Sequence, residues 1–101
     1  MEGEKTMTTH LSHIAATARL EAATETLAEY IGYLSGEIDA ELDKAAPNNG
    51  RIEALKHELE MVLDERRAIA LDDLALIDRA LYVRAPFLKL LRGAYSQSEP
   101  Q

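Results

Sequence analysis

Apolar residues recur at helical spacing along the first half of the chain. Two apolar rows share a repeat of seven residues: Leu20, Leu27 and Leu34, and Ile31, Ile38 and Ala45. Residues at these spacings lie on one face of an α-helix. We therefore predict a first helix over residues 11–46, preceded by an unstructured lead over residues 1–10. Gly32 and Gly36 lower helix propensity and leave open a kink within it.

The segment Pro47-Asn48-Asn49-Gly50 interrupts this pattern near the middle of the chain. Proline fixes φ, asparagine side chains cap turns, and glycine tolerates positive φ, so each residue type favours a turn. Two helices joined by a short turn pack side by side in opposite directions. The sequence therefore predicts a long antiparallel helical hairpin.

Beyond the turn, one apolar row gives way to another. The two rows are Ile52, Leu55, Leu59, Val62, Arg66 and Ile69, and then Leu63, Ala70, Leu74, Ile77 and Leu81. This drift fits one helix of ordinary period over residues 51–84, and it equally fits a break near 71–73, where Asp72 or Asp73 can cap a new helix.

The end of the chain contains a proline that limits the helices. Pro86 disfavours the helical conformation at Ala85, so we expect it to end the preceding helix and to open a short helix over residues 86–95, before a tail over 96–101. No strand-like alternation appears in the sequence. We predict a single all-α domain over residues 1–101, a small three- or four-helix bundle built on the long hairpin.

Charge separates the two halves of the chain. The net charge is −7; residues 1–46 carry −6 and residues 47–101 carry −1. An acidic first helix is repelled by nucleic acid and by anionic membranes, and it suits a basic protein surface. We expect a protein partner, no nucleic acid and no membrane. The start lacks the pattern of a signal peptide, and no apolar run is long enough to span a bilayer, so we expect a cytoplasmic protein.

Candidate chemistry is sparse. His10 and His13 have a spacing that can place two imidazoles on one helical face, but a metal site needs further ligands, and only His57 and scattered carboxylates remain. The chain has no cysteine, no nucleophile motif and no glycine loop that cradles phosphate. We expect no catalytic residue, metal or cofactor, and no enzymatic activity.

Partner binding is the better candidate, through acidic and aromatic side chains of the first helix. Tyr30 and Tyr33 flank Ile31 and belong either to the core or to its rim. Arg66 falls on an apolar row, which indicates either a structural ion pair or a contact with a partner. The residues that we expect to bind the partner are Leu20, Glu21, Glu25, Glu29, Tyr30, Tyr33 and Arg66.

One stretch of the second half resembles a known family. The pattern is Arg51-Ile52 … Leu55 … Glu58 … Leu63 … Glu65-Arg66 … Asp73 … Ile77 … Ala80, closed by Ala85-Pro86. It resembles, over residues 51–90, the small helical antitoxins of zeta-type toxin–antitoxin pairs. In that family the antitoxin binds a P-loop kinase toxin that phosphorylates UDP-N-acetylglucosamine, and one helix of the antitoxin obstructs the nucleotide site.

The resemblance implies an antitoxin whose acidic helix covers a basic phosphate-binding cleft of a toxin kinase. A second hypothesis remains open. Long amphipathic helices also pair between identical chains, so the protein can be a self-assembling structural or adaptor module, a homo-oligomer without a toxin partner.

Overall fold

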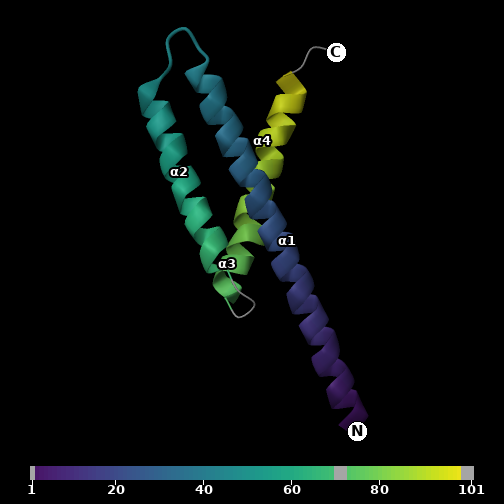
Figure 1. Cartoon of the computed structure of the whole chain (residues 1–101). Helices are drawn as coiled ribbons and strands as arrows, with labels where there is room; N and C mark the ends of the chain where they lie inside the picture. The colour runs from purple at the N-terminus through teal and green to yellow at the C-terminus, as the bar shows by residue number, and fades with distance from the viewer. Residues whose placement is uncertain (1, 70–72, 99–101) are drawn as a thin grey trace.

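The computed structural model describes the backbone of residues 2–69 and 73–98, and the side chains of residues 13–69 and 73–93. All regular structure in this part of the chain is helical, which confirms the all-α class (Figure 1). The elements are α1 (Glu2–Leu42), α2 (Asn49–Ala68), α3 (Leu74–Arg79), the π-helical turn η1 (Ala80–Arg84) and α4 (Ala85–Ser98). Because α3, η1 and α4 follow one another without a gap, they form a single helical stretch.

Helix α1 begins earlier and ends earlier than predicted. It is already helical at Glu2, within the segment expected to be unstructured, and that segment contains no proline to stop it. It continues through Gly32 and Gly36, where an added Cβ would meet nothing within 4 Å. Its last turn tightens: the amide of Lys44 donates to the carbonyl three residues back, that of Glu41, at 3.2 Å, and the helix ends at Leu42.

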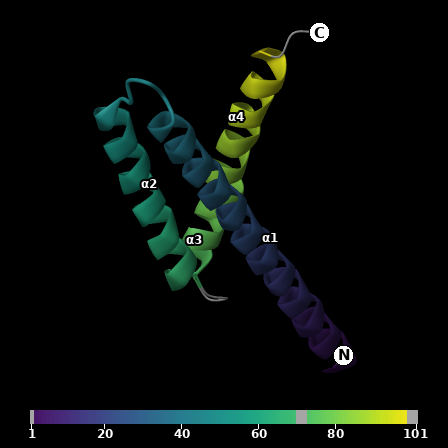
Figure 2. The same ribbon diagram turned by 45° about the horizontal axis from the view of Figure 1, so that its top comes forward.

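Helix α2 turns back along the C-terminal half of α1 (Figure 2). Asn48 caps it, because its side-chain oxygen accepts a hydrogen bond from the amide of Arg51 at 3.0 Å. Arg51 then ties the two helices together through Glu37, at 3.0 Å, and Glu41, at 3.7 Å. Helices α1 and α2 lie side by side only along the C-terminal half of α1. The N-terminal part of α1 extends past the end of α2 (Figure 1).

The last helical stretch starts at a capped end and runs through its proline. The side chain of Asp73 accepts from the amide of Leu76 at 3.2 Å and caps α3. The expectation that Pro86 ends a helix is wrong, since Ala85 is helical, with φ −63° and ψ −48°. The amide of Ala85 donates to the carbonyl of Ala80, five residues back. This wider π-helical turn relieves the crowding that a proline ring imposes on the preceding turn.

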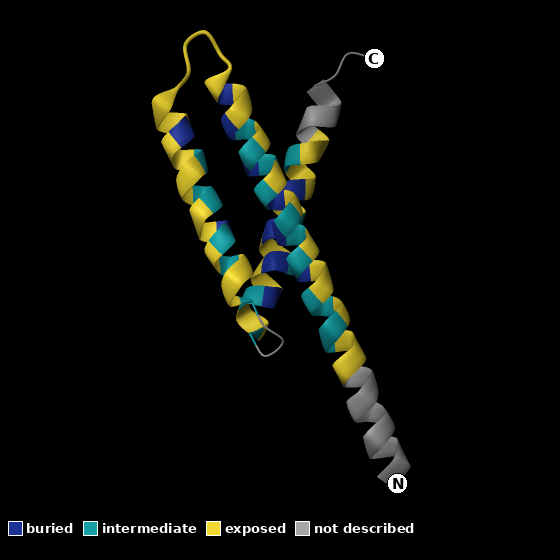
Figure 3. Cartoon of the chain, viewed as in Figure 1, coloured by how far each residue is buried: buried dark blue, intermediate teal, exposed yellow. Residues whose placement is uncertain are grey.

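The buried apolar cluster draws on all the helical stretches (Figure 3). Its members are Ala23, Leu27, Tyr30, Leu34, Val62, Ile77, Ala80 and Leu88. Residues of the predicted apolar rows are buried near the middle of the helices, and some of those at the helix ends are exposed. Ala45 is exposed because it lies beyond the end of α1, and Leu74 is exposed because it is the first residue of α3. Arg66, which lies between Val62 and Ile69 on its row, is also exposed.

The molecule is elongated and flat. Its principal extents are 69 × 35 × 15 Å, and its radius of gyration is 18.2 Å. A compact domain of this length has a radius of gyration of about 13 Å. Among the described helices, none is both long enough and apolar enough to cross a membrane.

Leu27 tests the core directly, because its side chain is only 1% exposed at the centre of α1. We expect Leu27→Ala to lower the free energy of unfolding by about 2–5 kcal/mol, through lost burial and the cavity left behind. The matched control, Leu42→Ala, removes a side chain that is 53% exposed and should change stability by less than about 0.5 kcal/mol. Urea titrations followed by circular dichroism measure both, and equal effects of the two changes would show that the core is misplaced.

Candidate functional site

A buried arginine joins the last helical stretch to α2. Arg84, in η1, has a side chain that is only 7% exposed. Its guanidinium donates to both carboxylate oxygens of Glu65, at 2.6 and 2.7 Å, and to Glu58 at 2.9 Å. The hydrogen bonds that Arg84 donates to Glu65 raise the pKa of Arg84 above its ordinary value, against the opposing effect of burial. Two-pronged pairing of this kind fixes orientation as well as charge.

Tyr30 brings α1 into the same network. Its ring lies under the guanidinium of Arg84, with 5.5 Å from the guanidinium carbon to the ring centroid, and its hydroxyl donates to Glu58 at 3.3 Å. Burial is the main reason that the pKa of Tyr30 is raised, and the neighbouring carboxylate of Glu58 adds to it. We call Tyr30, Glu58, Glu65 and Arg84 the Arg84 network; it links α1, α2 and η1.

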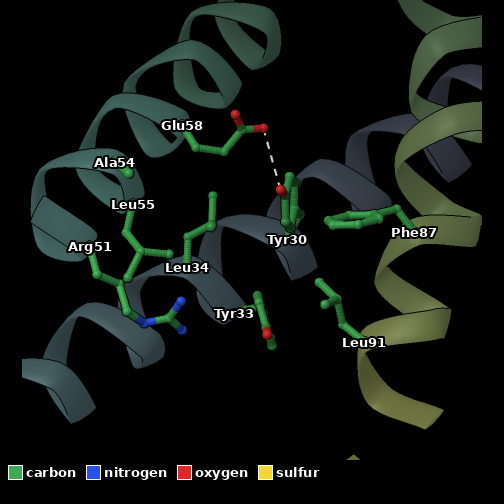
Figure 4. Close-up of a pocket in the computed structure, with 9 residues that line it drawn as sticks. All are labelled: Tyr30, Tyr33, Leu34, Arg51, Ala54, Leu55, Glu58, Phe87 and Leu91. Carbon is green, nitrogen blue, oxygen red and sulfur yellow. Dashed lines mark hydrogen bonds between the residues drawn. The ribbon is translucent and has the colours of Figure 1, made fainter. Parts of the chain in front are cut away.

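A groove of about 390 Å³ lies beside this network, with α2 and α4 on either side of α1 (Figure 4). Its lining is mainly aromatic and aliphatic, with two charged residues on the α2 side: Tyr30, Tyr33, Leu34, Arg51, Ala54, Leu55, Glu58, Phe87 and Leu91. The ring of Tyr30 stacks on that of Tyr33, with centroids 6.4 Å apart, and meets the edge of Phe87 at 6.3 Å. Aromatic side chains with polar tips are typical of surfaces that a partner half buries.

An exposed apolar ridge borders this groove. Val83, Phe87 and Leu90 are 60%, 49% and 71% exposed. Their spacings of four and three residues place them on one face of the η1–α4 helix, and Phe87 is also part of the groove lining. The groove and the ridge meet at Phe87, and the ridge side chains are exposed in the described part of the chain.

The acidic residues expected to bind a partner lie on α1, away from the groove lining. Glu21 and Glu25 are exposed, and no ion pair within the described residues engages them. Glu29 is exposed as well, but its carboxylate lies 3.2 Å from the guanidinium of Arg92 on α4. Leu20 packs partly buried against the core. The three glutamates thus share a face, and one of them, Glu29, is also paired with α4.

The other predicted residues are spread over the molecule. Tyr30 is 4% exposed and belongs to the core, while Tyr33 is half-buried in the groove. Arg66 is exposed on α2, whereas the buried arginine that pairs with carboxylates of α2 is Arg84. A sequence signal for Arg84 exists, because it continues the helical spacing of Ile77 and Ala80.

Glu41 is a buried acidic residue of α1. It follows Leu34 by seven residues, and its side chain is only 3% exposed. It lies 2.7 Å from Lys44 and 3.7 Å from Arg51, so both neighbouring cations compensate its charge. The acidic surface of α1 is therefore smaller than the sequence indicates.

No metal-binding cluster of three acidic or histidine side chains is found in the described part of the chain. His13 is exposed, and the side chain of His10 lies outside the described residues. Comparison of the chain with protein-family models, with curated proteins and with solved structures finds no match.

The raised pKa of Tyr30 predicts a stability change in alkaline solution. An unfolded tyrosine ionises near pH 10, and the folded protein resists that ionisation. The contribution to stability is thus fully present below about pH 10 and is lost as the pH rises through the folded pKa. Phenylalanine has no hydroxyl to ionise. We therefore expect the unfolding free energy of Tyr30→Phe to fall less than that of the wild type as the pH rises above about 10. Urea titration at each pH measures both. Equal decreases in the unfolding free energy of the two proteins would contradict the buried position of the Tyr30 hydroxyl.

Proposed function

We propose that this chain is a partner-binding protein that neutralises a larger protein, the P-loop kinase toxin of a zeta-type toxin–antitoxin pair. The observation that carries the proposal is the acidic face of α1. Glu21 and Glu25 are exposed one helical turn apart and are free of ion pairs within the described residues. Because both side chains are exposed, a partner can reach them.

Carboxylates on a helix suit a cleft built for phosphates. Such clefts present lysine and arginine side chains, which pair with carboxylates as well as with phosphates. A helix that occupies the cleft excludes the nucleotide and so stops phosphoryl transfer. The resemblance of residues 51–90 to zeta-type antitoxins supports this assignment, and a cytoplasmic location, where the kinase meets its nucleotide, fits it.

Two acidic side chains are better suited to this role than the third. Glu29 is paired with Arg92, so a partner would have to break that contact before binding it. Exposed charges mainly accelerate encounter, and affinity comes from apolar contacts made around them. We therefore assign the steering role to Glu21 and Glu25, with the apolar contacts made by neighbouring side chains such as Leu20.

The test is co-expression with the adjacent gene product. We expect the wild type to rescue growth from that product, and Glu21→Lys with Glu25→Lys to rescue poorly, because the association rate falls at least about tenfold when the charge is reversed. The matched control is Glu53→Lys with Glu60→Lys, which makes the same change of net charge at exposed positions of α2. Association rates measured at low and high salt complete the comparison.

Two outcomes would refute the proposal. One is a neighbouring product that is harmless alone and does not co-purify with this chain. The other is equal loss of rescue in both doubly reversed proteins, which would assign the effect to net charge and not to the α1 face. The self-assembling helical module would then be the better account, and the exposed ridge on α4 is the observation that favours it.

A further inference from the structure

Arg19 ties helix α1 to the last helical stretch. Its guanidinium donates a hydrogen bond to the hydroxyl of Tyr82 at 3.1 Å and pairs with the carboxylate of Asp78. The guanidinium carbon also lies 5.6 Å from the centroid of the Tyr82 ring. A single side chain of α1 thus makes three contacts with α3 and η1. We call Arg19, Asp78 and Tyr82 the Arg19 clamp.

The clamp lies where α1 joins the packed part of the molecule. Among the described side chains, Arg19 is the most N-terminal one of α1 with a hydrogen bond or an ion pair to another helix. Before it, Thr17 donates only to the carbonyl of His13 in the same helix, and Ile14 is 50% exposed. Leu20, directly after Arg19, packs against the core. The polar attachment of this part of α1 therefore depends on Arg19.

Glu21 and Glu25 follow the clamp within two turns of the helix, on a different side of it. Two residues correspond to about 200° of rotation around a helix, and six residues to about 240° after a full turn. Neither carboxylate therefore faces the guanidinium of Arg19, and both remain exposed. The clamp leaves their charges free and fixes the direction of the helix that carries them.

We propose that Arg19 is a positioning residue for the acidic face of α1. It holds this part of the helix against α3 and η1, so that Glu21 and Glu25 keep one orientation before a partner arrives. The inference rests on the proposed function, in which these glutamates meet a basic cleft. Groups that are ordered in advance lose less conformational entropy on binding, and the gain in affinity appears mainly as slower dissociation.

Hydrogen exchange of the free full chain, followed by NMR, tests the clamp without a partner. We expect Arg19→Met to accelerate exchange of the amides of residues 17–25 by roughly 3- to 10-fold, because the contacts of exposed charges are individually weak. The matched control is Arg67→Met, which makes the same change of net charge and removes an exposed ion pair within α2. This control should leave exchange at residues 17–25 unchanged. Asp78→Asn should accelerate exchange in the wild type and add little to Arg19→Met.

Binding to the adjacent gene product separates positioning from charge. Loss of Arg19 makes the chain more acidic, so electrostatic steering alone predicts faster association with a basic partner and no change in dissociation. The clamp predicts that the dissociation rate rises, by roughly the same 3- to 10-fold. Arg67→Met should dissociate as the wild type does. Surface plasmon resonance measures both rates for each protein.

Three results would overturn the role of Arg19. They are unchanged exchange at residues 17–25 in Arg19→Met, an effect of Asp78→Asn that persists in full without Arg19, and a complex of Arg19→Met that dissociates as the wild type does. If circular dichroism shows that Arg19→Met has lost helicity, Arg19→Lys replaces it, because lysine keeps the charge and lacks the forked guanidinium. A wild type that does not bind would refute the proposed function, and the exchange rates would still decide whether the clamp orders this segment.

Discussion

The buried guanidinium of Arg84 needs compensating carboxylates, and both of those within reach belong to α2. Glu65 binds it through two oxygens and Glu58 through one, while the ring of Tyr30 lies against its face. An uncompensated charge in this position would be very costly, so α1, α2 and η1 must meet in a single arrangement. Direct packing between α1 and α2 builds the hairpin, and the Arg84 network determines how the last helical stretch crosses it.

The π-helical turn places Arg84 where this pairing happens, and it lets the helix continue past Pro86. Helix α4 therefore extends beyond the core, with Leu88 inward and the ridge outward. The groove is the direct result, because α2 and α4 diverge on either side of Tyr30 (Figure 4). The Arg84 network fixes how the last helical stretch crosses the hairpin. That crossing leaves the groove and the outward apolar side chains of α4 uncovered.

The apolar periodicity predicts the helices and the buried Leu27 and Leu34 of α1, and the segment from Pro47 to Gly50 predicts a break between the first two helices. It could not predict the helix through Pro86, because the wider turn depends on an amide of Ala85 bonding five residues back. Nor could it separate Arg66 from Arg84, since that choice depends on which arginine the crossing helix brings to Glu58 and Glu65. The acidic face was predicted in part. Glu29 is paired with Arg92, which is distant in sequence, and Glu41 is buried beside Lys44 and Arg51.

A double-mutant cycle between Arg84 and Glu65 tests the central constraint most directly. The proteins are Arg84→Met, Glu65→Met and the double variant, with unfolding free energies from urea titration. We expect Arg84→Met to cost about 3–5 kcal/mol, because two carboxylates lose their partner. The double variant should cost less than the sum of the single variants by at least about 1 kcal/mol. Strictly additive losses would show that the buried pair does not hold these helices together.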